Sequence, residues 1–167
     1  MKQKHFTKWL LGLVTFVAVT ILAACGSGKE NAHYFQKINQ TAKSDIRMTY
    51  YYKGDTVTRQ TTENELPYSY FGTSDKEAAK AILEPSSKQY QNIKGVKESI
   101  TYGENSIKEK LEIDYEVVNF KELAKVDKTF ASTNTGKNTK VSMKASAKLL
   151  ENNNFKEVKD GKFESLK

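Results

Sequence analysis

Residues 106–117, SIKEKLEIDYEV, carry the strand pattern that decides the fold of this 167-residue chain. Alternate positions hold apolar side chains and the positions between them hold charged ones: Ile107, Leu111, Ile113, Tyr115 and Val117 against Lys108, Lys110, Glu112, Asp114 and Glu116. Because successive side chains of a strand point to opposite faces, this alternation predicts a strand with one buried and one solvated face. Such a strand is typical of an antiparallel sheet that is open to water on one side.

Two hairpins are predicted around this strand. Residues 96–102 alternate in the same way, and Gly103-Glu104-Asn105 supplies a turn before the strand at 107–117. Further upstream, Ile46, Met48, Tyr50 and Tyr52 share one parity, and Lys53-Gly54-Asp55 leads into a Thr-rich segment at 56–65. A glycine-containing turn between two alternating segments is typical of a β-hairpin.

A helix is predicted after the first hairpin. Ser74-Asp75-Lys76-Glu77 has the spacing of a capping box with Ser74 as the N-cap, and the apolar stripe that follows reaches Tyr90. Pro85 lies inside this helix and should kink or split it.

Two further helices complete the pattern. One follows Asn119, and the last runs from about Met143 to Asn152, with Asn154 as a left-handed cap before a terminal strand at 155–158. A hairpin followed by a helix therefore occurs twice, at 46–90 and 96–126. The expected fold class is α+β, an antiparallel sheet built from hairpin-helix units, with the helices packed on one face.

The first 25 residues have the features of an export signal. Met1–Lys8 carries three lysines and no acid, and the apolar run from Trp9 to Leu22 is shorter than the roughly 20 residues that span a bilayer as a helix. The next residues, Leu22-Ala23-Ala24-Cys25, resemble the lipobox of bacterial lipoproteins. That resemblance implies cleavage between Ala24 and Cys25 and attachment of diacylglycerol to the Cys25 thiol, and two acyl chains suffice for stable anchoring. The alternative is an ordinary secretory signal that ends in a free cysteine.

The expected organisation is a removed signal peptide at 1–24, the lipidated cysteine and a tether at 25–42, and one α+β domain at 43–167. We expect the protein on the extracytoplasmic side of the cell membrane, held there by diacylglyceryl-Cys25. Since Cys25 is the only cysteine, the domain contains no disulfide of its own.

Composition excludes several functions. The chain after residue 24 has 24 Lys and Arg residues against 20 Asp and Glu residues, and only Arg47 and Arg59 are arginines, so a nucleic-acid partner is not expected. His33 is the only histidine after the signal, which argues against a catalytic triad and a multi-histidine zinc site. No phosphate-binding or calcium-binding loop motif occurs. We expect no enzyme activity, no metal and no cofactor.

Three stretches resemble the YehR family of small bacterial lipoproteins. They are YYKGDTVTRQTTEN at 51–64, AKAILEPSSKQYQNIKGVKESITY at 79–102 and AKLLENNNFKEVKD at 147–160. The sequence departs from the family pattern at Asn154, where a glycine commonly precedes the phenylalanine. The resemblance implies a lipoprotein with a compact α+β domain, and it implies no activity.

Two segments are candidate sites. Residues 66–73, LPYSYFGT, place Tyr68, Tyr70 and Phe71 next to a helix N-terminus, where the rings can stack on a ligand or instead cover the sheet edge as part of the core. Glu112, Asp114 and Glu116 form a row of carboxylates on the solvated face, which can hold a divalent cation or remain a solvated charged surface.

Two functions from different classes remain. A membrane-anchored module that binds a small ligand, peptide or envelope component predicts a concave site with aromatic lining. A structural or interaction protein that docks on an envelope partner predicts a flat apolar area instead. An enzyme based on carboxylates ranks third, and it predicts two buried acids in one cleft.

Overall fold

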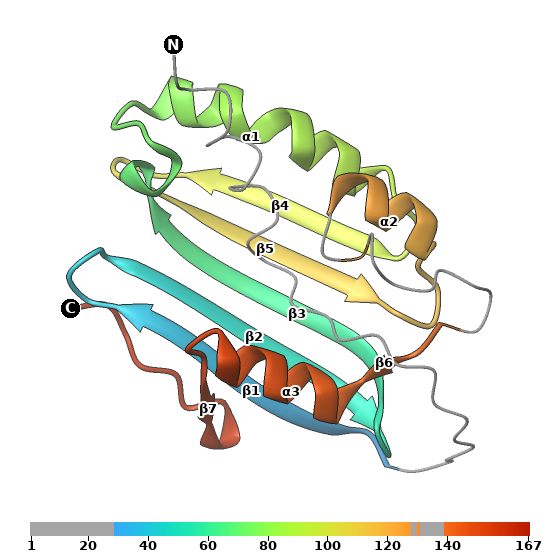
Figure 1. Cartoon of the computed structure of the whole chain (residues 1–167). Coiled ribbons are helices and arrows are strands. Elements are labelled where there is room, and N and C mark those ends of the chain that lie inside the picture. Colours follow the sequence, from blue (N-terminus) through green and yellow to red (C-terminus); the bar gives the residue numbers. More distant parts are fainter. Residues whose placement is uncertain (1–28, 128–129, 131–138) are drawn as a thin grey trace.

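The computed structural model describes residues 29–127, 130 and 139–167, and its centre is a seven-stranded antiparallel sheet (Figure 1). The strand order is β4-β5-β3-β2-β1-β7, and β6 pairs with the end of β3. The strands are β1 (Asn31–Asn39), β2 (Ser44–Lys53), β3 (Thr56–Pro67), β4 (Val96–Tyr102), β5 (Ser106–Asp114), β6 (Val141–Ser142) and β7 (Lys156–Val158). The helices are η1 (Tyr68–Phe71), α1 (Lys76–Gln91), α2 (Phe120–Val126), α3 (Met143–Asn152) and η3 (Lys159–Gly161).

The two predicted hairpin-helix units are confirmed. The β2–β3 hairpin precedes α1, and the β4–β5 hairpin precedes α2. The units join where β3 pairs with β5, from Arg59 opposite Asp114 to Pro67 opposite Ser106. Beyond β2 the sheet is extended by β1, which pairs with β2, and then by β7, which pairs with the other edge of β1.

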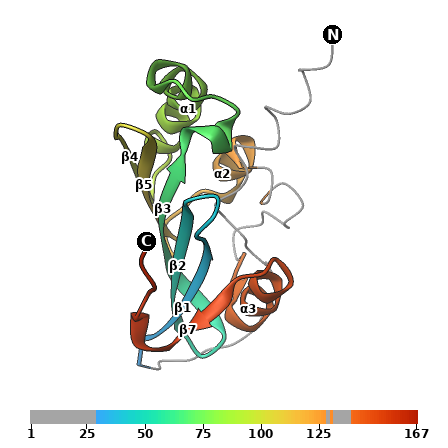
Figure 2. The same ribbon diagram turned by 90° about the vertical axis from the view of Figure 1, so that its left-hand side faces the viewer.

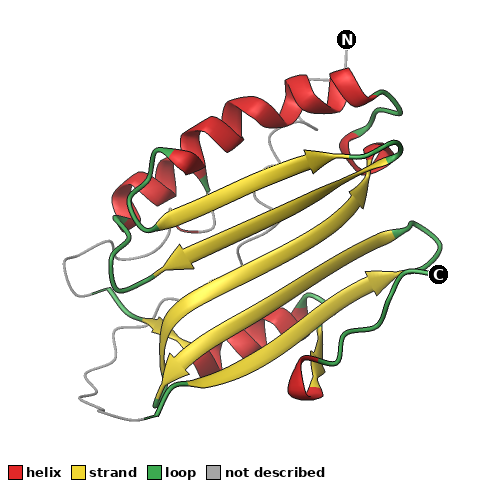
Figure 3. Cartoon of the chain, turned by 180° about the vertical axis from the view of Figure 1, so that it is seen from behind, coloured by secondary structure: helices red, strands yellow, loops and turns green. Residues whose placement is uncertain are grey.

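The helices α1, α2 and α3 lie on one face of the sheet, as the view along the sheet shows (Figure 2). This inner face carries the apolar core, in which Phe35, Met48, Tyr50 and Ile113 are fully buried. The opposite, outer face is seen directly in Figure 3 and carries cross-strand ion pairs between β3, β4 and β5. The α+β class and the coverage of one face are therefore as the sequence predicted.

The folded part of the chain begins earlier than expected. β1 starts at Asn31 and runs through Phe35, inside the range 25–42 that the sequence analysis assigned to the lipidated cysteine and tether. In the sequence, the segment NAHYFQKIN resembles a linker because its strongly apolar residues are only Phe35 and Ile38. Of these two, Phe35 alone is fully buried. Its place in the sheet comes from pairing with β2, which no local pattern reveals.

The strand predicted at 107–117, which is β5 in the structure, is shorter than predicted. β5 ends at Asp114, whose carbonyl accepts hydrogen bonds from the amides of Val117 and Val118 at 3.3 and 2.8 Å. The turn reverses the direction of the chain, so Tyr115 still reaches the core whereas Val117 is 44% exposed. The prediction that Val117 faces inward is therefore wrong.

The N-terminus of α1 also differs from the prediction. Asp75, and not Ser74, is the N-cap, because its side chain accepts a hydrogen bond from the amide of Ala78 at 2.8 Å. Of the two effects predicted for Pro85, a kink or a split, the split is wrong, because the helix continues from Lys76 to Gln91. The bounds of α3 and the left-handed conformation of Asn154, with φ of 65°, are confirmed.

Candidate functional site

The aromatic loop is part of the core in this structure. Tyr68 is 2% exposed and Phe71 is 6% exposed, and the Tyr68 hydroxyl donates to the Gly103 carbonyl at 2.7 Å. Tyr70 is half-buried and packs edge-on against Phe71, with 5.6 Å between the ring centroids. Since two of the three rings are covered, the burial favours packing over stacking on a ligand.

One member of the carboxylate row, Glu112, is paired with cations of the same sheet face. Glu112 lies 2.8 Å from Lys97 and 3.5 Å from Arg59, and the hydrogen bond from Lys97 is the main reason that its pKa is lowered. Asp114 accepts the amide of Glu116 at 2.9 Å in the turn after β5. Among the residues that the structure describes, no group of three or more His, Cys, Asp or Glu side chains can hold a metal ion. The expected row is therefore not continuous: Glu112 is ion-paired, Asp114 ends the strand, and Glu116 is exposed in the turn that follows.

A polar file on the inner face was missed by the sequence analysis. Gln60, Thr62 and Asn64 of β3 are each at most 3% exposed and point toward the helices. Gln60 donates to Thr62 at 3.1 Å and accepts from the Tyr115 hydroxyl at 2.7 Å. Hydrogen bonding of this kind is what makes buried polar groups tolerable, so most of the file is a structural network.

Glu109 of β5 is the ionisable neighbour of this file, and its exposure is intermediate. Its carboxylate accepts a hydrogen bond from the Asn64 side chain at 2.7 Å, opposite it in the β3–β5 register. Burial raises the pKa of Glu109 from 4.5 to about 7, the Asn64 bond opposes the rise and nearby Glu98 adds to it. Position 109 shares the parity of Ile107 and Leu111, which is the signal that the sequence offered.

An open cavity of about 550 Å³ lies between the start of β1, the β2–β3 turn and α3. We call it the His33 pocket. Its lining combines rings, apolar groups and charges: His33, Tyr52, Gly54, Asp55, Met143, Lys144, Ala147, Lys148 and Glu151. Lys144, Ala147, Lys148 and Glu151 recur at intervals of three and four residues, so they lie on one face of α3.

The wall formed by α3 is fixed to the β2–β3 turn by Asp55. One Asp55 carboxylate oxygen accepts the Lys144 amide at 2.8 Å, and the other accepts the Ser142 hydroxyl at 2.8 Å. Ser142 in turn caps the helix by accepting the amide of Ala145 at 3.1 Å. The helix start and the turn therefore form one rigid side of the pocket.

His33 is held by aromatic contacts while one ring nitrogen lacks a hydrogen bond. Its ring packs edge-on against Tyr52, with 5.1 Å between centroids. Nδ1 is buried and has no hydrogen-bond partner in the described part of the chain, and its nearest acid oxygen, on Glu157, is 3.9 Å away. That distance is too long for a hydrogen bond. Within the described residues, Nδ1 is therefore an unpaired buried polar atom, which is unusual in a folded protein.

Ala24 and Cys25, the predicted cleavage and lipidation residues, lie outside the described residues. No helix in the described ranges is long and apolar enough to cross a membrane.

Comparisons with known proteins extend over nearly the whole domain. A sequence model of a protein family of unknown function, DUF1307, matches residues 31–156. The uncharacterized lipoprotein Lmo0207 of Listeria monocytogenes is 36% identical over 156 residues, which are 93% of this chain and 99% of that protein. The uncharacterized lipoprotein YehR of Escherichia coli is 35% identical over 157 residues, 94% of this chain and 100% of that protein.

Solved structures share the fold. The NMR structure of E. coli YehR superposes with a TM-score of 0.62 at 32% identity and covers 80% of this chain and 94% of its own. An NMR structure of a protein from Streptococcus pneumoniae TIGR4 gives a TM-score of 0.51 at 15% identity over 86% of this chain and 94% of its own, which shows the fold alone. The chain belongs to the DUF1307 family, together with YehR and the other uncharacterised lipoproteins that it matches.

Proposed function

We propose that this protein is a membrane-anchored extracytoplasmic lipoprotein whose domain binds a small anionic envelope component in the His33 pocket, without chemistry of its own. Three relatives are named lipoproteins, and Leu22–Cys25 has the matching lipobox pattern. The pocket is the observation that carries the binding role.

The size and lining of the pocket support a small ligand. A volume of about 550 Å³ is within the range of ligand sites, which are roughly 300–1,000 Å³. Tyr52, Met143 and Ala147 offer ring and apolar contacts. The two exposed lysines, Lys144 and Lys148, face one exposed carboxylate, Glu151, because the Asp55 carboxylate is already bonded to the Ser142 hydroxyl and the Lys144 amide. A ligand with an apolar or sugar body and an anionic group satisfies both kinds of contact.

The position of the pocket supports a ligand from the envelope. Asn31 pairs with Tyr52, so the chain enters β1 beside the pocket. Asn31 is six positions after Cys25, and six extended residues span at most about 20 Å. If Cys25 carries the lipid, the pocket lies within reach of the bilayer surface.

The alternative of docking through an apolar surface has less support. It requires a contiguous apolar patch larger than a few hundred Å². Among the described residues, Val117 is the one large apolar side chain that is exposed, at 44%. A single exposed valine is ordinary on a protein surface.

The proposed lipid-anchored location is tested with Cys25→Ser in the host cell. We expect the wild-type protein to remain with membranes after a high-salt wash and to be degraded when protease is added to cells whose wall has been removed. The Cys25→Ser variant should move to the soluble fraction because it cannot receive the acyl chains. Tight membrane association of this variant, or protection of the wild type from protease, would contradict the proposed location.

The pocket is tested by native mass spectrometry of the mature protein from its own envelope extract. We expect an added mass that denaturation removes, and its loss in Ala147→Trp, because the indole fills the pocket. The control is Asn152→Trp, an exposed position on the same helix that does not line the pocket. An unliganded wild-type mass, or equal added mass in both variants, would refute the proposed site.

A further inference from the structure

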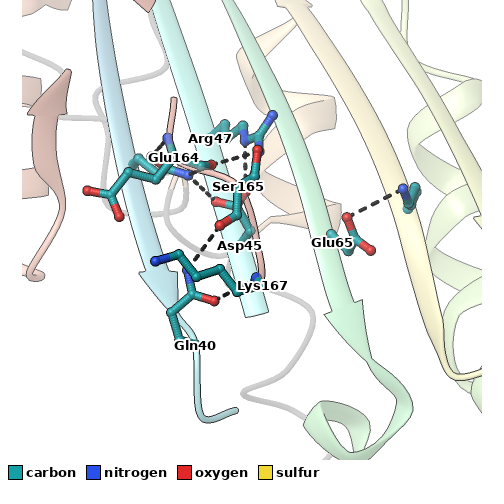
Figure 4. A network of polar contacts seen from close by, with 9 residues as sticks. Gln40, Asp45, Arg47, Glu65, Glu164, Ser165 and Lys167 are labelled. Atoms are coloured by element: carbon teal, nitrogen blue, oxygen red, sulfur yellow. Dashed lines mark hydrogen bonds and ion pairs between the residues drawn. The ribbon is translucent and has the colours of Figure 1, made fainter. Parts of the chain in front are cut away.

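The last residues of the chain occupy a polar cradle on the outer face of β1 and β2, opposite the helices (Figures 2 and 4). We define the cradle by Tyr34, Gln36, Gln40, Lys43 and Arg47, and the tail by residues 162–167. Six hydrogen bonds join the cradle to the main chain of the tail.

Two glutamines form hydrogen bonds with the main chain of the tail. The Gln36 side chain donates to the Glu164 carbonyl and accepts from the Glu164 amide, both at 2.9 Å. Gln40 repeats this pattern further along, donating to the Ser165 carbonyl at 3.0 Å and accepting from the Lys167 amide at 2.9 Å. Each side-chain amide thus pairs with peptide groups as a neighbouring strand would.

A buried carboxylate holds the cradle in place. Asp45 is 2% exposed and accepts from Gln36 at 2.7 Å and from Arg47 at 2.8 Å. Arg47 also donates to the Glu164 carbonyl at 3.0 Å. Because Asp45 orients both donors from beneath, their geometry does not depend on the tail's side chains.

One side chain of the tail is recognised. Phe163 packs edge-on against Tyr34, with 6.2 Å between centroids, and lies 5.3 Å from the Arg47 guanidinium. The side chains of Glu164, Ser165 and Lys167 are exposed to solvent, whereas Leu166 is half-buried. The cradle therefore selects an extended backbone with an aromatic residue and leaves the three exposed positions free.

We propose that this cradle is a binding site for an extended peptide segment of a partner protein, with an aromatic residue as its anchor, and that the chain's own tail fills the site until such a segment displaces it. The tail is held mainly by hydrogen bonds at the surface and by two half-buried side chains, Phe163 and Leu166. Such bonds contribute little net free energy, while ordering a terminal segment has an entropic cost, so the tail is suited to exchange. The site is separate from the His33 pocket and does not depend on the proposed ligand.

The test measures binding of a fluorescent peptide with the sequence of residues 159–167, KDGKFESLK, to the full mature chain. Phe163→Ala weakens the internal tail, so this variant should bind the peptide with a Kd at least ten-fold lower than the wild type. Replacing phenylalanine by alanine in the peptide should weaken binding at least ten-fold. No saturable binding to either protein, or equal binding by both, would overturn the proposal.

A second pair of variants tests the cradle itself. Gln40→Ala in the Phe163→Ala background should weaken peptide binding at least five-fold, whereas Gln91→Ala, a glutamine on α1 outside the cradle, should leave it unchanged. Equal effects of the two substitutions would overturn the assignment. Wild-type dimers that Gln40→Ala dissociates would show that a second copy provides the occupant, and would also overturn it.

Discussion

Glu109 lies opposite Asn64 on the face of β5 that otherwise carries Ile107 and Leu111. Its pKa is raised to about 7, mainly by burial. A carboxyl group whose pKa is higher in the folded state than in the unfolded state destabilises the fold once the unfolded chain has lost its proton. The stability of the domain should therefore fall as the pH rises from about 4.5 to about 7.

Glu109→Gln should remove this pH dependence. Glutamine keeps an oxygen for the Asn64 amide and adds a donor for the Asn64 Oδ1 atom, which has no partner in the described residues. At pH 8 we expect the variant to be more stable than the wild type by roughly 1–3 kcal/mol, and at pH 4 the difference should vanish. Urea denaturation at several pH values measures both.

The control for this substitution is Glu63→Gln, which removes an ion pair with Lys110 on the outer face. It should retain the wild-type loss of stability between pH 4.5 and 7. If Glu109→Gln shows the same loss, burial of Glu109 is not its cause.

For single residues, the sequence predicted which side chains are buried but not which residues they contact. The alternation in residues 106–117 assigned Ile107, Leu111 and Ile113 to the buried face correctly. Position 109 shares their parity, but Glu109 was not among the residues predicted there. The hydrogen bond to Asn64 depends on which residue of β3 lies opposite, and that register follows from the pairing of two hairpins. A histidine at position 33 likewise gives no sign that α3, more than a hundred residues later, will form a pocket beside it.

At the scale of elements, α1 shows how a capping residue can be misplaced by one position. Asp75 accepts the amide of Ala78, and its own amide donates to the Thr73 hydroxyl at 3.0 Å. Ser74 caps nothing in this arrangement because the helix begins at Lys76. A sequence that offers Ser and Asp side by side predicts a helix start without deciding between them.

Asp75→Ala should therefore destabilise the domain by about 1 kcal/mol, and Ser74→Ala should have a smaller effect. Thermal unfolding of the two variants under identical conditions provides the comparison. A larger effect of Ser74→Ala would show that the capping box begins at Ser74 after all.

Elements with strong local signals were the most predictable. Asn119 and Ser142 cap α2 and α3 through their own side chains, so the starts of these helices are marked in the sequence. β1 has no such mark, because it alternates Tyr34 and Gln36 on one face with His33, Phe35 and Lys37 on the other. Its place is decided by pairing with β2 and β7.

At the scale of the whole molecule, β1 connects the two candidate binding surfaces. His33 points toward α3 and lines the pocket, while Tyr34 and Gln36, on the opposite face of the strand, contact the tail. The tether enters the domain at the same strand. A ligand at the pocket and a peptide at the cradle would thus both bind at the first strand after the proposed lipid anchor.

The most direct test of the binding role is to locate the site in solution. We would record amide NMR spectra of the isotopically labelled mature protein before and after addition of a small-molecule extract of its envelope. We expect the largest changes in amide chemical shift at His33, Tyr52, Gly54 and Ala147. Ala147→Trp should abolish these changes. Changes confined to other regions, or none at any extract concentration, would contradict the claim that the His33 pocket binds an envelope component.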